Sequence, residues 1–153
     1  MDYYEKDGSP VSIDYETPEG KALSAKLWSR EYRRVAQNYV GDVHVSTVFL
    51  PIDHGWGEGP PVLFETMVFG YKVQRMRGAR SRLRRRWMDF RGRGFDSDFA
   101  GYWEEPEYQW RYCTEAEALA GHAVILGAVK RGKLSEDMVL AVPINTTQKV
   151  VDS

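Results

Sequence analysis

The chain has 153 residues, of which 42% are hydrophobic, 28% charged and 13% aromatic. This length suits one compact domain, and the aromatic content is too high for an intrinsically disordered chain. A single cysteine excludes an internal disulfide and any zinc cluster built from several cysteines. We therefore expect residues 1–153 to form a single domain.

The sequence shows no targeting or membrane-spanning signal. Its first residues, MDYYEKD, are acidic and aromatic, unlike the basic and then apolar start of a secretory signal. No apolar run approaches the roughly 20 residues needed to cross a bilayer. We expect a cytoplasmic protein without a membrane partner.

Charge is distributed very unevenly along the chain, although the net charge is only −1. Between Lys72 and Arg93 there are ten Lys or Arg residues and one acid, so this segment carries +9. The remaining 11 basic and 21 acidic residues carry −10. The sequence thus predicts an acidic body with a basic, Arg-rich insert, which we place at residues 71–100.

The first predicted helix covers residues 17–31. Thr17 is a suitable N-cap, and Pro18 is suited to the first helical position. The preceding residues 1–15 are expected to form an irregular or short extended lead-in.

Three strands are predicted next, at residues 32–40, 43–50 and 62–69, because these runs are rich in β-branched and aromatic residues. A Gly- and Pro-rich loop at 51–61 joins the last two. Alternation in the second strand places four side chains on one face, namely Val43, Val45, Thr47 and Phe49.

A fourth strand is predicted at residues 108–113, followed by a helix over 114–131. Thr114 and Glu117 have the spacing of a capping box. The helix is expected to carry its apolar stripe on Leu119, Ala123, Leu126 and Val129. A last short strand at 138–144 and a loose tail at 145–153 complete the prediction.

Together these elements predict an α+β fold. We expect a mostly antiparallel sheet of three to five strands, covered by the helix in the C-terminal half, with a second helix near the N-terminus and the basic insert.

Several motifs resemble one family in the same order along the chain. They are VSTVFL at 45–50, DHGWG at 53–57, PPVLFETMVF at 60–69 and RYCTEAEALAGH at 111–122. This pattern is similar to that of small uncharacterised proteins of actinobacterial phages and prophages. The resemblance implies a phage origin without supplying an activity. Here the chain departs from the pattern in carrying the basic insert and in having Cys113 in place of a small polar residue.

The basic insert is the first candidate binding site. Arginines interleaved with aromatic residues can bind phosphates and stack on bases, and the same run could instead bind an acidic protein surface or a second copy of the chain. A solvated arm without a specific partner is the remaining alternative. The candidate contact residues are Arg80, Arg82, Arg84, Arg85, Arg86, Trp87 and Arg91.

A second candidate site surrounds the Gly- and Pro-rich loop, where Asp53, His54, Trp56 and Glu65 would line any small pocket. A histidine beside a carboxylate can act as an acid–base pair. The structural alternatives are that Asp53 caps a turn, that His54 packs on Trp56, and that Glu65 pairs with a basic residue across the sheet.

Other arrangements are weaker. The three histidines, His44, His54 and His122, could join Asp42, Asp53 and Glu65 around a metal, but their spacing matches no metal motif. No catalytic set, cofactor or metal is therefore predicted. The leading hypothesis is a phage accessory protein that binds a host or phage macromolecule. The alternatives are an anti-defence protein that sequesters a small nucleotide, a nucleic-acid-binding protein, a virion component and an enzyme centred on Asp53 and His54.

Overall fold

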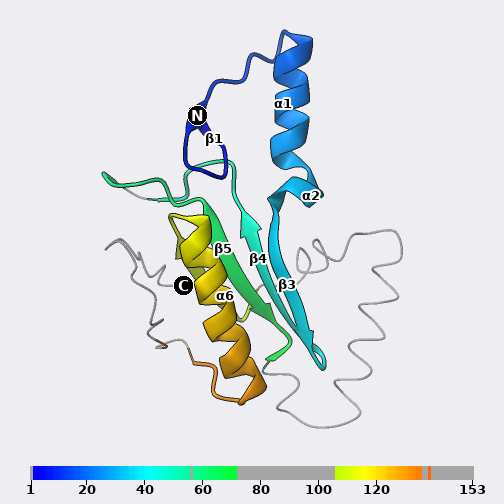
Figure 1. The fold of residues 1–153 in the computed structure, drawn as a ribbon, viewed down its shortest axis with the longest axis vertical. Coiled ribbons are helices and arrows are strands. Elements are labelled where there is room, and N and C mark those ends of the chain that lie inside the picture. The colour runs from blue at the N-terminus through cyan, green and yellow to red at the C-terminus, as the bar shows by residue number, and fades with distance from the viewer. Residues whose placement is uncertain (1, 56, 72–105, 136–137, 139–153) are drawn as a thin grey trace.

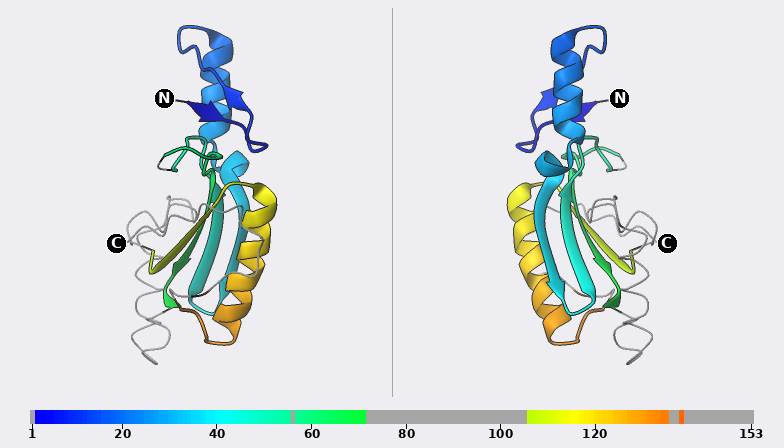
Figure 2. Two further views of the ribbon diagram at one scale, coloured as in Figure 1. Left: turned by 90° about the vertical axis from the view of Figure 1, so that its left-hand side faces the viewer. Right: turned by 90° about the vertical axis from the view of Figure 1, so that its right-hand side faces the viewer.

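A computed structural model of the chain describes residues 2–55, 57–71, 106–135 and 138 (Figure 1). Its centre is an antiparallel sheet of four strands in the order β3-β4-β5-β6. These strands are Arg34–Val40, Val43–Phe49, Phe64–Phe69 and Tyr108–Tyr112. Helix α6, Glu115–Lys130, lies along one face of the sheet (Figure 2). The protein is an α+β protein, as the sequence predicts.

The predicted N-terminal helix is present as α1, Pro18–Trp28, and the Thr17 side chain caps it by accepting from the Gly20 amide at 3.1 Å. It ends earlier than predicted because Ser29 has an extended backbone, and Ser29 then caps the short helix α2, Arg30–Arg33. Figure 1 shows α1 projecting beyond the end of the sheet.

The predicted lead-in contains a small hairpin. Its strands are β1, Tyr3–Tyr4, and β2, Pro10–Val11. Glu5, between them, holds α1 and α2 by accepting from Lys26 Nζ at 2.9 Å and from the Tyr32 hydroxyl. The hairpin is thus joined to the helices by polar contacts.

Helix α6 begins with the predicted capping box, in which Thr114 and Glu117 each accept from the other's backbone amide. The predicted apolar stripe was wrong at Leu119, which is 46% exposed, and at Ala123, which is also exposed, but Val129 is buried and Leu126 packs against the core. The face that packs on the sheet is rotated towards small residues and a histidine. Its buried members are Ala118, Gly121, His122, Ile125, Ala128 and Val129.

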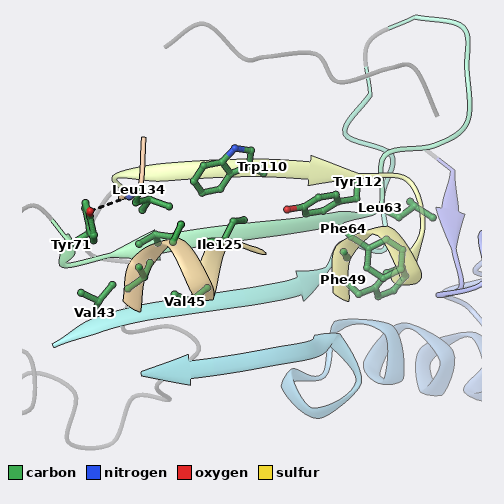
Figure 3. Close-up of a cluster of buried hydrophobic side chains, with 14 of the residues drawn as sticks. Val43, Val45, Phe49, Leu63, Phe64, Tyr71, Trp110, Tyr112, Ile125 and Leu134 are labelled. Atoms are coloured by element: carbon green, nitrogen blue, oxygen red, sulfur yellow. Dashed lines mark hydrogen bonds between the residues drawn. The ribbon is translucent and has the colours of Figure 1, made fainter. Parts of the chain in front are cut away.

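The core lies between α6 and the sheet (Figure 3). The predicted inward face of β4 is confirmed, because Val43, Val45 and Phe49 belong to this core and Thr47 is fully buried. Phe49 and Phe64 pack with ring centroids 5.4 Å apart. Burial of such apolar area is the main source of stability.

Gly121 allows α6 to approach β6 closely. A Cβ atom at this position would lie 2.3 Å from the Tyr112 hydroxyl oxygen and 2.6 Å from a ring carbon. Tyr112 is almost completely buried, so its ring has little room to move away. The choice of glycine here sets the distance between helix and sheet.

Several predictions fall outside the described residues. The basic insert is described only at Tyr71, and neither the predicted strand at 138–144, apart from Met138, nor the tail at 145–153 is described. None of the helices in the described ranges is long and apolar enough to cross a membrane.

Candidate functional site

The loop between β4 and β5 is organised by Asp53. Its Oδ1 atom accepts hydrogen bonds from the Gly55 amide at 2.7 Å and the Val62 amide at 2.8 Å. The His54 amide donates to the Val62 carbonyl at 3.0 Å. These contacts close the base of the loop, which agrees with the alternative in which Asp53 caps a turn.

Glu65 lies on the sheet face opposite α6, because Phe64 and Thr66 on either side of it face the helix. Its Oε1 atom accepts from Arg111 Nε at 2.9 Å and from the Gln109 amide group. Glu65 and Arg111 are direct partners in the β5–β6 register. The cross-strand pairing expected for a carboxylate on a half-buried sheet face is therefore present.

His54 lies within electrostatic range of this ion pair. Partial burial lowers the pKa of His54, and the positive charge of Arg111 acts in the same direction. The carboxylates of Glu65 and Asp53 oppose these effects. The lowered pKa favours the neutral imidazole at neutral pH, and part of the His54 side chain is exposed to solvent. Trp56, the fourth residue proposed for this pocket, lies outside the described residues.

A row of aromatic rings crosses the same face at the other end of the sheet. Tyr39 in β3 stacks on His44 in β4, with ring centroids 4.4 Å apart and planes at 6°. His44 in turn lies 5.8 Å from Phe69 in β5, at 29°. The Gln37 amide nitrogen contacts His44 Nε2 at 2.8 Å. We call Tyr39, His44 and Phe69 the aromatic row. The sequence did not predict this row, because it arises from the register of three neighbouring strands.

The face under α6 contains a buried polar chain. His122 Nε2 contacts Asn38 Oδ1 at 2.8 Å, and His122 Nδ1 contacts the Thr47 hydroxyl at 2.8 Å. Thr47 is also hydrogen-bonded to the Thr66 hydroxyl at 2.5 Å. Both threonines are fully buried. This chain links α6 to three strands.

The contacts assign the direction of these hydrogen bonds. Because Asn38 presents an oxygen, His122 Nε2 carries the proton and Nδ1 accepts from Thr47. Thr47 then accepts from Thr66. Burial lowers the pKa of His122, which agrees with a neutral ring. The protein uses this histidine as a structural group that needs to stay uncharged.

Tyr112 lies next to this chain. Its hydroxyl is buried and forms no hydrogen bond with any described group. The Thr66 hydroxyl lies close enough to affect the pKa of Tyr112. Burial raises the pKa of Tyr112 to about 12, with Thr66 acting in the opposite direction. The phenol therefore stays protonated at all moderate pH values.

The residues considered for a metal do not converge. His122 lies under α6, whereas His44 and Glu65 lie on the opposite face of the sheet. Within the described ranges, no group of three or more His, Cys, Asp or Glu side chains is arranged to hold a metal ion. Partial burial, together with the Glu117 and Asp53 carboxylates, raises the pKa of Cys113. That thiol is therefore a poor nucleophile at neutral pH.

The candidate contact residues of the insert lie outside the described part of the chain, from Arg80 to Arg91. Its two points of attachment are described. They are the end of β5 at Phe69 and the start of β6 at Tyr108, which are neighbouring strands of the sheet. The basic segment thus leaves and rejoins the sheet at one end, the end that carries the aromatic row.

No family model, curated protein or solved structure matches this chain.

Proposed function

We propose that this protein acts by binding a macromolecule, and that the macromolecule is a nucleic acid. The observation that carries the proposal is the net charge of +9 between Lys72 and Arg93, in a chain that is otherwise acidic. Lys and Arg side chains that neutralise phosphates release condensed counterions, which gives sequence-independent affinity. The acidic remainder repels nucleic acid, so contact is directed to the basic segment.

The position of the attachment points supports this proposal. Phe69, the last residue of β5, belongs to the aromatic row and precedes Lys72 by three positions. In the sequence, the cationic residues therefore follow shortly after an aromatic residue that lies at this end of the sheet. Proteins that bind single strands combine these two kinds of contact.

We further propose that the chain is an accessory protein of a bacteriophage or prophage that works in the host cytoplasm. The support is the ordered set of motifs that resembles actinobacterial phage proteins. This context is compatible with a target of host or phage origin, and the binding measurement below is independent of it.

The test is native mass spectrometry of gently purified protein, at low and then at high ionic strength. We expect bound RNA or DNA that dissociates as the salt concentration rises. A small ligand that survives high salt would instead favour a pocket at Asp53, His54 and Glu65 and the sequestration of a nucleotide. An empty protein would favour a protein partner or a place in the virion, and peptides in purified particles would identify the latter.

Arginine variants sharpen the test. Replacing Arg84, Arg85 and Arg86 together by Gln should weaken the binding of a labelled oligonucleotide. It should also make the plot of log K against log salt less steep by about 2, because each phosphate contact contributes about 0.7 for single strands. The matched control replaces three exposed basic residues at the end of α6 by Gln, namely Lys130, Arg131 and Lys133. Equal losses in both variants would contradict a specific role for the insert.

A further inference from the structure

We propose that the outer face of helix α6 is an interface with a second copy of this chain, in which the two α6 helices pack antiparallel. This face is the side of α6 that is turned away from the sheet (Figure 2). It is apolar along most of its length, it carries opposite charges at its two ends, and it can pair with itself about a twofold axis.

The outer face of α6 has the composition of a covered surface. No Asp, Glu, Lys or Arg lies between Glu117 and Lys130, although α6 already buries its other side against the sheet. A helix that covers one side of a core normally presents polar residues to solvent, whereas a helix that is apolar all round is normally buried on all sides. Leu119 is nevertheless 46% exposed. The outer face therefore fits an apolar partner better than it fits water.

The residues of this face follow the helical repeat. Ala116, Leu119, Ala120 and Ala123 are exposed and are spaced at three or four positions, so they lie on one side of the helix. Gly127 continues the same side and is partly exposed. Short side chains let a second helix axis come close, and Leu119 supplies the largest apolar group of the contact.

The two ends of the face carry opposite charges, which point to a second copy as the partner. Glu115 is the first residue of α6 and Lys130 is the last. Within the described part of the chain, neither side chain takes part in an ion pair. Parallel α6 helices would bring like charges together at both ends, whereas antiparallel helices place Glu115 of each copy beside Lys130 of the other. The antiparallel arrangement also opposes the two helix macrodipoles.

A twofold axis through the middle of α6 makes the face complementary to itself. Leu119 and Leu126 lie at equal distances from the middle of the helix, so Leu119 of one copy approaches Leu126 of the other. The helix has 16 residues and is therefore about 24 Å long. Its outer face alone gives an interface at the small end of the known range. We therefore expect a weak dimer that forms at micromolar protein concentrations.

Analytical ultracentrifugation of the full chain, without nucleic acid, tests for this dimer. The unmodified protein should change from monomer to dimer as its concentration rises through the micromolar range. Leu119→Arg should raise the dissociation constant at least about 10-fold, because a charge replaces an apolar contact in both copies. Tyr15→Arg is the matched control, since Tyr15 is also 46% exposed but lies in the N-terminal segment. This control should dimerise like the unmodified protein.

Charge reversal tests the antiparallel arrangement. Glu115→Lys and Lys130→Glu each place like charges side by side at both ends of the interface. Each should weaken dimerisation about 5- to 30-fold at low ionic strength. The double variant restores opposite charges and should dimerise like the unmodified protein, although both changes oppose the helix macrodipole. Damage to the fold would not be repaired by combining the two changes.

Three results would overturn the proposal. They are a protein that stays monomeric throughout the micromolar range, a dimer that Leu119→Arg leaves unchanged, and a double charge variant that dimerises more weakly than either single variant. None of them affects the proposed binding of nucleic acid, because the oligonucleotide is titrated with protein kept below the concentration at which it dimerises.

Discussion

The two faces of the central sheet use polar and aromatic residues in different ways. Under α6, the polar side chains are directed at one another, and the chain from Asn38 through His122 and Thr47 to Thr66 satisfies its members internally. On the opposite face, the aromatic row runs from buried Phe69 to exposed Tyr39. The difference indicates that the polar side chains under α6 maintain the fold by satisfying one another, whereas the opposite face holds stacked rings and the Glu65–Arg111 ion pair. Changes under α6 should therefore alter stability first.

The largest effect on stability is expected for Gly121→Ala. A Cβ at this position would lie 2.3 Å from the Tyr112 hydroxyl oxygen and 2.5–2.6 Å from its ring carbons, so the helix or the tyrosine has to move within a packed core. We expect a loss of about 3 kcal/mol, the upper part of the range for overpacking. Denaturant unfolding measures it.

Gly127→Ala is the matched control for that change. Its Cβ would meet only the flexible end of Arg131, at 3.1 Å. The higher helix propensity of alanine should then raise stability, by up to about 1 kcal/mol. Equal losses in both variants would show that the contact with Tyr112 does not matter.

An intermediate effect is expected for Thr47→Val, which keeps the shape of the side chain and removes its hydroxyl. His122 Nδ1 would lose its donor, and the Thr66 hydroxyl would lose its acceptor, both in a buried position. Leaving buried polar groups without partners should cost about 2 kcal/mol. Thermal unfolding measures the loss. In a double-mutant cycle with His122→Leu, the stability losses of the two single variants should not add in the double variant. Simple additivity would contradict the hydrogen bonds assigned between Thr66, Thr47 and His122.

The smallest effect is expected in the pH dependence of stability. Burial lowers the pKa of His122, so the unfolded chain binds a proton at a higher pH than the folded chain does. Stability should be constant above the unfolded pKa of about 6.5 and should fall as the pH decreases below it. The free energy of unfolding, measured between pH 7.5 and pH 5.5, tests this window, which lies above the range in which most carboxylates titrate.

His122→Gln and His54→Gln distinguish the source of that pH dependence. The first should flatten the curve, because glutamine can form hydrogen bonds but does not titrate in this range. His54→Gln should leave most of the pH dependence of stability in place, because His54 is exposed and its protonation is coupled more weakly to folding. A curve that flattens only in His54→Gln would assign the effect to the loop.

The sequence by itself determined the four strands of the central sheet and the helices α1 and α6, although it placed Tyr32 and Arg33 in a strand and they lie in the short helix α2. β-branched and aromatic runs gave the strands, and Thr17 and Thr114 marked the two helix starts because capping is a local interaction. Alternation placed Val43, Val45 and Phe49 on the inner face of β4. The basic segment was also visible in the sequence, since charge adds up along the chain irrespective of folding.

Only the tertiary structure decided which residues meet. The buried face of α6 was mispredicted from Leu119, because close packing against Tyr112 selects Gly121 and turns the helix. The aromatic row, the polar chain at His122 and the pairing of Glu65 with Arg111 all join different strands or join the helix to the sheet. Such contacts depend on register and on helix rotation. Local sequence patterns do not encode them, because the packing of the whole core sets both.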